Sequence, residues 1–122
     1  KAAVAALTGN LKPSLEMTQE FTRRRARVME LIKDIPGFKC FAPEGAFYIF
    51  PDVSYYYGKS DGTQTVANAA DFSMYLLNTA NVSSVMGDAF GEPNCVRFSF
   101  ANSMPNIERA WARIKEALAK LK

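Results

Sequence analysis

Residues 96–101 place a single charge inside an apolar strand pattern, which limits how this part of the chain can fold. The segment reads Val96-Arg97-Phe98-Ser99-Phe100-Ala101. Its alternation and its aromatic residues are typical of a β-strand. A guanidinium stays charged, so a strand that half-buries Arg97 needs an anionic partner or a route to water.

Two interpretations of Arg97 follow from this chemistry. In the first, Arg97 is a structural arginine on an edge strand, reaching solvent or pairing with a nearby glutamate. In the second, its rigid fork of N–H donors binds the carboxylate of a ligand in a bidentate manner. The residues alone leave both interpretations open.

The length of 122 residues is enough for one domain with its own core. No apolar run reaches the roughly 18 residues of a membrane span, and the first residues lack the pattern of a signal peptide. The net charge of +3 is spread along the chain, which does not favour nucleic-acid binding. We therefore expect a cytoplasmic protein without a membrane or nucleic-acid partner. Because the sequence starts without Met, we also expect a piece of a longer protein.

The sequence contains no histidine and only two cysteines, Cys40 and Cys95. The absence of histidine excludes Ser-His-Asp and Cys-His nucleophile systems and all His-based metal sites within this sequence. Two separated cysteines cannot form a zinc site alone, so no metal site is predicted. They are interpreted as free thiols of a reducing compartment, with a disulfide as the alternative.

Helical and strand-like segments follow one another in the order helix, hairpin, helix, strand, strand, helix. Helices are expected over 1–8, from Pro13 to residue 35 with Ser14 as N-cap, over 66–80 with Asn81 as C-cap, and from Ser103 as N-cap toward residue 121. Strands are expected over 38–41, 46–50, 82–85 and 96–101, the first two forming a hairpin. This order predicts an α+β fold, a small antiparallel sheet packed against helices.

The last helix shows the clearest helical periodicity. Its predicted apolar stripe is Ile107, Ala110, Trp111, Ile114, Leu118 and Leu121. In contrast, Arg23, Arg24, Arg25 and Arg27 of the first long helix are expected to form its solvated side.

Two glycine-containing segments do not match phosphate-binding motifs. Gly58-Lys59-Ser60 resembles the end of a P-loop, but Val53 stands where the first glycine is required. The segment 52–65 is therefore interpreted as a surface loop. Residues 87–91 form a glycine-bounded loop whose spacing does not fit a dinucleotide fingerprint.

Several motifs, taken in order, resemble the C-terminal small domain of the class I aminotransferases, pyridoxal-phosphate enzymes of fold type I. They are Pro43-x-Gly45-Ala46-Phe47-Tyr48, Leu76-Leu77 followed by Val82, Gly87-x-x-Phe90-Gly91, Val96-Arg97-Phe98-Ser99-Phe100-Ala101, and Asn106-Ile107 with Ala110, Ile114 and Leu118. The resemblance extends from about residue 2 to residue 121, and the bacterial aspartate aminotransferase branch is the most similar. Met86 stands where the family usually has a proline.

The resemblance implies roles for two residues. Arg97 corresponds to the arginine that binds the α-carboxylate of the amino acid or 2-oxo acid substrate. Phe47 corresponds to an aromatic residue near the substrate pocket, with a core strand residue as the alternative. Residues 1–10 would then end a large-domain or interdomain helix, and residues 11–122 would form the small domain.

The resemblance also implies what this chain lacks. In the family, the Schiff-base lysine and the other pyridoxal 5'-phosphate ligands lie in the large domain, upstream of Lys1. We therefore expect that the chain alone neither binds the cofactor nor transaminates. The intact protein is expected to be a homodimer that transfers an amino group, with aspartate and 2-oxoglutarate as the expected substrates.

The alternative function class is an RNA-recognition-like α+β module that binds nucleic acid. Residues 44–50 loosely resemble the aromatic strand of such a domain. The segment lacks the leading basic residue, and the helix-first order does not follow that fold.

Overall fold

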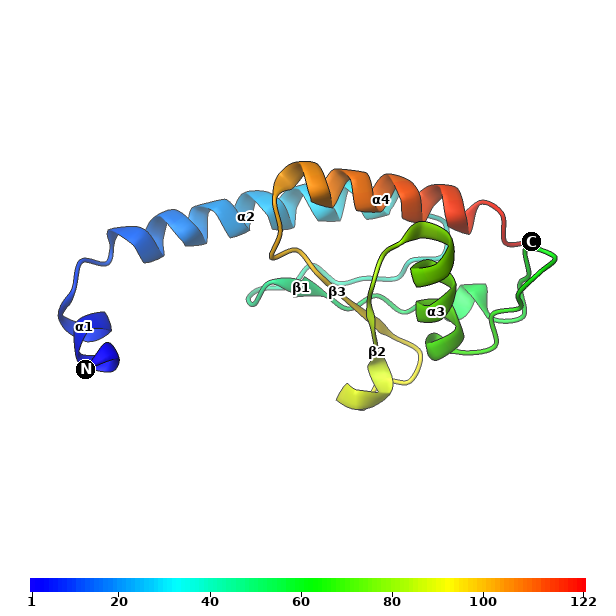
Figure 1. Cartoon of the computed structure of the whole chain (residues 1–122), viewed down its shortest axis with the longest axis horizontal. Coiled ribbons are helices and arrows are strands. Elements are labelled where there is room, and N and C mark those ends of the chain that lie inside the picture. Colours follow the sequence, from blue (N-terminus) through cyan, green and yellow to red (C-terminus); the bar gives the residue numbers. More distant parts are fainter.

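The computed structural model describes residues 1–122 as an α+β chain, with helices packed on one face of a small antiparallel sheet (Figure 1). The sheet has three strands in the order β1-β3-β2, and both outer strands run antiparallel to β3. The elements are α1 (Ala2–Thr8), α2 (Lys12–Lys33), β1 (Tyr48–Ile49), the 3-10 helix η1 (Ser54–Tyr56), α3 (Ala69–Ala80), β2 (Val85–Met86), the 3-10 helix η2 (Gly87–Phe90), β3 (Val96–Ser99) and α4 (Met104–Leu118). The predicted α+β class is confirmed.

The buried side chains form one apolar cluster between the sheet and helices α2, α3 and α4. The C-terminal segment contributes Ile107, Trp111, Ile114, Leu118 and Leu121. Of the predicted stripe, only Ala110 is partly exposed. Fully burying a side chain of this size contributes roughly 1.5–3 kcal/mol, so this stripe fixes α4 on the sheet. Figure 1 shows α4 running beside α2.

Helix α2 begins one residue earlier than predicted, at Lys12, so Ser14 lies inside the first turn and is not the N-cap. The side-chain oxygen of Asn10 accepts a 2.9 Å hydrogen bond from the Lys12 backbone N–H and satisfies one of the free donors of the helix start. Ser103 does occupy the N-cap of α4, as predicted, although its hydroxyl makes no capping hydrogen bond.

The arginines of α2 are less solvated than predicted. Arg27 Nε lies 2.8 Å from Glu108 Oε1 and so connects α2 to α4. Arg25 donates a 2.8 Å hydrogen bond to the carbonyl of Pro43. Only Arg23, which pairs with Glu20, is largely exposed, at 67% of its side chain. Arg25 and Arg27 therefore use part of their donor capacity to fix α2 to its neighbours, whereas Arg24 pairs with Glu20 of the same helix.

The predicted hairpin of 38–41 and 46–50 is largely wrong. The second segment contributes only β1, which pairs with β3, and the first makes a single antiparallel bridge, between Lys39 and Asp52. Pro43 and Pro51 lack N–H donors, and Ala46 adopts a left-handed φ of 61°. Each of these interrupts a regular ladder between the two segments.

The segment 52–65 is not simply a surface loop. Val53 and Tyr56 are fully buried within it, at 0% and 3% exposure. The Tyr56 hydroxyl donates a hydrogen bond to the carbonyl of Pro36. The polar composition of the segment concealed these two core positions. Its Lys59 lies over the ring of Tyr55, with Nζ 4.8 Å from the ring centre.

Helix α3 begins at Ala69 rather than at residue 66, because Asn68 caps it by accepting a 2.9 Å hydrogen bond from the Asp71 N–H. It ends as predicted at Asn81, which adopts the left-handed conformation with φ 52°. Of the strand expected at 82–85, only Val85 lies in β2, which extends to Met86. The glycine-bounded loop that follows forms the 3-10 helix η2.

Three further findings bear on function class. Cys40 and Cys95 are free and half-buried, in agreement with the thiol interpretation. No helix has both the length and the apolar character needed to cross a membrane. The three-stranded sheet follows two helices in the chain, so the layout of an RNA-recognition domain is not found.

Candidate functional site

The face of the sheet opposite the helices carries the candidate site. Along β3, Val96 and Phe98 are buried in the core, so Arg97 and Ser99 project from the other face. The register places Tyr48 opposite Ser99 and Val85 opposite Arg97. Because directly paired residues share a face, Tyr48, Val85, Arg97 and Ser99 line the same surface.

Arg97 lies at the centre of this face. β3 is the central strand, so the interpretation of Arg97 as an edge-strand arginine is wrong. Its side chain is half-buried and takes part in none of the ion pairs or side-chain hydrogen bonds of the structure. Pairing with a nearby glutamate, one option of that interpretation, is not found either.

The guanidinium of Arg97 instead contacts two aromatic rings. Its Cζ lies 4.5 Å from the ring centre of Phe90 and 5.1 Å from that of Tyr48. Both distances are within the range of cation–π attraction, in which a cation lies over the face of an aromatic ring. The in-plane N–H donors make no side-chain bond, and such a set matches the two oxygens of a carboxylate.

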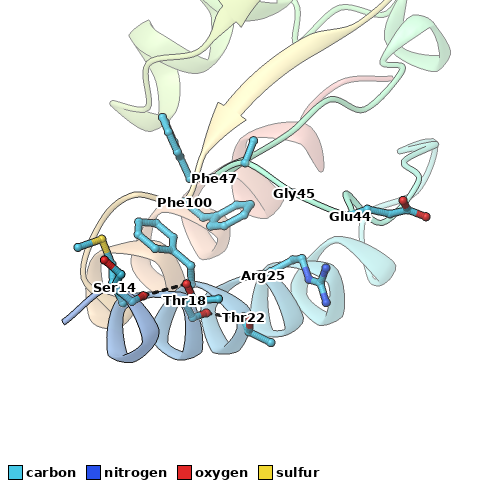
Figure 2. Close-up of a pocket in the computed structure, with 11 residues that line it drawn as sticks. Ser14, Thr18, Thr22, Arg25, Glu44, Gly45, Phe47 and Phe100 are labelled. Carbon is cyan, nitrogen blue, oxygen red and sulfur yellow. Dashed lines mark hydrogen bonds between the residues drawn. The ribbon is translucent and has the colours of Figure 1, made fainter. Parts of the chain in front are cut away.

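The cavity that Phe47 lines does not include Arg97. Its ring is 50% exposed and lies 6.2 Å from the ring of Phe21 on α2. It lines a cavity of about 430 Å³ between the first half of α2 and the segment 44–47. Figure 2 shows Ser14, Thr18, Thr22 and Arg25 along the α2 side, with the segment that carries Glu44, Gly45 and Phe47 opposite them. Tyr48 contacts both sequence-predicted site residues: its ring lies 5.8 Å from that of Phe47 and 5.1 Å from Cζ of Arg97.

The polar groups around this cavity mostly bind their own chain. Thr18 donates to the carbonyl of Ser14, Thr22 donates to that of Thr18, and Arg25 is held by Pro43. The aromatic rings of Phe21, Phe47 and Phe100 remain as its apolar wall. The cavity therefore suits an apolar group better than a charged one.

Sequence reasoning did not identify Tyr48 and Phe90 as site residues. Both lie inside motifs that were noticed, and Phe90 stands between Gly87 and Gly91. The available signal in the sequence was a phenylalanine between two closely spaced glycines. Its ring is 47% exposed, and it packs edge-on against Phe50 at 5.9 Å.

The lysines of this chain do not fit a pyridoxal phosphate site. Such a site needs an amine in a closed environment and a cradle of donors for the phosphate. No lysine is buried. Lys59 lies over Tyr55, and Lys115 Nζ lies 3.6 Å from Asp34 Oδ2. These lysines therefore do not form such a site. No group of three His, Cys, Asp or Glu side chains is arranged to bind a metal.

Comparison with known proteins places this geometry in a family. The sequence pattern of the family "Aminotransferase class I and II" matches residues 1–114. The bifunctional aspartate aminotransferase and glutamate/aspartate-prephenate aminotransferase of Petunia hybrida is 41% identical, over 100% of this chain and 26% of the relative. An aspartate aminotransferase of Streptomyces avermitilis is 34% identical, over 98% of this chain and 29% of the relative.

Solved structures agree with this assignment. The aspartate aminotransferase from Rhizobium meliloti superimposes with a TM-score of 0.92 and 37% identity, covering 99% of this chain and 30% of that one. The alanine aminotransferase from Pyrococcus furiosus gives a TM-score of 0.84 and 29% identity, covering 97% of this chain and 28% of that one. The chain thus spans less than a third of the length of these relatives. It has the fold of the corresponding part of the fold-type I aminotransferases, and it belongs to the class I and II aminotransferase family.

Proposed function

We propose that this chain is the substrate-binding small domain of a pyridoxal-phosphate-dependent aminotransferase and that Arg97 binds the α-carboxylate of the substrate. One observation carries the proposal. A half-buried guanidinium on the central strand has no anionic partner in its own chain. A partly desolvated charge of this kind gains most from a carboxylate that arrives with the substrate.

In this role Arg97 binds the substrate carboxylate and orients the substrate. Two parallel N–H···O bonds fix the plane of the carboxylate and thereby the direction of the neighbouring Cα–H bond. Holding a reacting bond in one orientation lowers the barrier that the rest of the enzyme must overcome. Its position on β3, paired with a strand on either side, makes Arg97 a rigid anchor for this purpose.

Phe47 is proposed as part of the aromatic wall near the substrate. Its 50% exposure and its place in the cavity beside α2 support this role over that of a core strand residue. The ring-to-ring contact between Phe47 and Tyr48 supports a continuous aromatic surface toward Arg97.

The intact protein is proposed to have a large domain that binds pyridoxal 5'-phosphate. Residues 1–10 would end the helix that joins the two domains, and residues 11–122 would form the small domain. The complete exposure of α1, which buries no residue, supports a partner for it outside this chain. Apolar side chains at Leu7, Leu11 and Leu15, each at least 61% exposed, support a covered surface in a homodimer or against the large domain. The two free thiols support a cytoplasmic location.

Aspartate and 2-oxoglutarate are proposed as the substrates. Relatives at 34–41% identity carry aspartate in their names, which supports this choice. One of them also names prephenate, and a structural neighbour names alanine. The choice is tested by comparing kcat/KM of the intact enzyme for aspartate and alanine as amino donors and for 2-oxoglutarate and prephenate as amino acceptors. A preference for alanine over aspartate, or for prephenate over 2-oxoglutarate, would contradict it.

Substitution Arg97→Lys in the intact enzyme tests the carboxylate role. Lysine keeps the charge but loses the bidentate fork, and a charge-assisted bond contributes roughly 1.5–3 kcal/mol. We expect kcat/KM for amino acids to fall about 10- to 100-fold, with cofactor absorbance unchanged. Arg113→Lys, at an exposed position of α4, is the matched control and should leave kcat/KM unchanged. An unchanged kcat/KM for Arg97→Lys would refute the role.

A further inference from the structure

Two aromatic rings from different elements contact the guanidinium of Arg97. Tyr48 comes from β1 and Phe90 from η2, and their ring centres lie 5.1 Å and 4.5 Å from Cζ. Tyr48 pairs with Ser99, two residues along β3 from Arg97, so it is a diagonal neighbour on the same face of the sheet. The position of Tyr48 thus follows directly from the strand register.

The position of Phe90 is fixed by the turn that carries it. The backbone N–H of Gly87 donates a 2.8 Å hydrogen bond to the carbonyl of Cys95, just before β3, and Glu92 N–H donates to the Gly87 carbonyl at 3.1 Å. Gly91 closes the turn in the left-handed conformation, with φ 80°. These bonds attach η2 to the start of the same strand that carries Arg97.

Core packing gives little reason for the placement of Phe90. Its ring remains 47% exposed, and its aromatic contact apart from Arg97 is the edge-on contact with Phe50. A half-exposed ring in a closely bonded turn leaves an aromatic face available for a contact outside the core. The only cation over this ring is the guanidinium of Arg97.

We propose that Phe90 and Tyr48 are positioning residues that hold the guanidinium of Arg97 through cation–π contacts, so that its N–H edge is already oriented for the substrate carboxylate. This inference rests on the proposed carboxylate role of Arg97. A long side chain fixed before binding loses less rotamer entropy when the substrate arrives, and this raises affinity without a new contact. We call Tyr48 and Phe90 the aromatic bracket. The aromatic bracket therefore sets how tightly Arg97 binds the substrate carboxylate.

The test uses the intact, cofactor-loaded enzyme with Phe90→Leu, which keeps an apolar side chain but removes the π face. We expect KM for the amino acid and for the 2-oxo acid to rise roughly 3- to 30-fold, with a smaller change in kcat. Cofactor absorbance and the melting temperature should stay as in the wild type. Phe90→Tyr, which restores the ring, should return KM to within twofold of the wild-type value.

Phe41→Leu is the matched control, because Phe41 is 98% exposed and makes no aromatic or cation contact. A double-mutant cycle with Arg97→Gln separates positioning from general destabilisation. In the Arg97→Gln variant, which has no guanidinium, adding Phe90→Leu should lower kcat/KM by less than twofold relative to Arg97→Gln alone.

Two results would overturn the inference in different ways. If Phe90→Leu leaves KM unchanged, or lowers kcat/KM equally in both backgrounds, the bracket does not position Arg97, while the carboxylate role stands. If Arg97→Gln itself leaves kcat/KM unchanged, the carboxylate role fails, and the bracket fails with it.

Discussion

The ring of Phe38 lies edge-on to the indole of Trp111, with the ring centres 6.0 Å apart and the planes at 79°. The same ring also meets Tyr56, Phe72 and Phe98 at 6.1–6.3 Å. Phe38 therefore joins the segment after α2 to η1, α3, β3 and α4 at once. This contact keeps the helices in place behind the strand that carries Arg97.

Phe38→Ala should lower the free energy of unfolding by about 3 kcal/mol, since it leaves a cavity between four aromatic rings. The matched control is Phe41→Ala, three residues further along, whose side chain is 98% exposed. That change should stay within about 0.5 kcal/mol. Urea unfolding followed by tryptophan fluorescence measures both, and equal losses for the two variants would contradict the central role of Phe38.

The sequence predicted elements with a local cause better than elements that depend on distant partners. The stripe of α4 and the left-handed end of α3 at Asn81 follow from spacing and residue type, and both were found. The hairpin at 38–50 was not found, because Lys39 pairs with Asp52, which in turn bridges to Cys95 far along the chain. Strand length depends on such pairings, and alternation alone does not contain them.

The candidate site also contains features that the local sequence predicts and features that depend on distant residues. Arg97 could be singled out from the sequence because a charge inside an apolar strand has few explanations. Only the structure shows that β3 is the central strand and that no carboxylate of the chain pairs with Arg97. The contact of Phe90 with Arg97 arises only when η2 folds onto the start of β3. The sequence around Phe90 does not predict which side chain its ring will contact.

Gly87→Ala should disturb the site more than its small size suggests. A Cβ at Gly87 would lie 2.0 Å from the carbonyl oxygen of Glu92 and 2.6 Å from that of Cys95, and both are backbone atoms. The turn must shift, so Phe90 moves off Arg97. We expect a loss of about 1–3 kcal/mol in stability and a raised KM in the intact enzyme.

Gly45→Ala is the control for that substitution. A Cβ at Gly45 meets nothing within 4 Å, and its φ is not positive. Its stability should change by less than about 0.5 kcal/mol. Crystal structures of both variants would show the difference directly, and an unmoved η2 in Gly87→Ala would contradict the steric argument.

The two thiols should react slowly near neutral pH. Burial raises the pKa of the Cys40 thiol, and burial together with the charge of Asp52 raises the pKa of Cys95. A raised pKa means less thiolate at a given pH, and the thiolate is the nucleophile. Alkylation by iodoacetamide should therefore be slower than for glutathione at pH 7.5 and should still be rising above pH 9. Mass spectrometry of the folded chain, with the urea-unfolded chain as control, measures both rates; equal rates would contradict the effect of burial.

Tyr75→Phe tests the hydrogen bond that joins α3 to α4. The Tyr75 ring is fully buried, and its hydroxyl donates a 2.9 Å hydrogen bond to the carbonyl of Ala117. That carbonyl also accepts from the Lys120 N–H at 3.1 Å, so it keeps one partner in the variant. We therefore expect the free energy of unfolding to fall by about 1 kcal/mol. This is the contribution of one hydrogen bond, and it is less than the cost of leaving a buried carbonyl without any partner. Tyr55→Phe, at a ring 51% exposed, is the matched control and should change it by less than about 0.5 kcal/mol. If the two variants unfold at the same urea concentration, the Tyr75 hydroxyl does not hold α3 against α4.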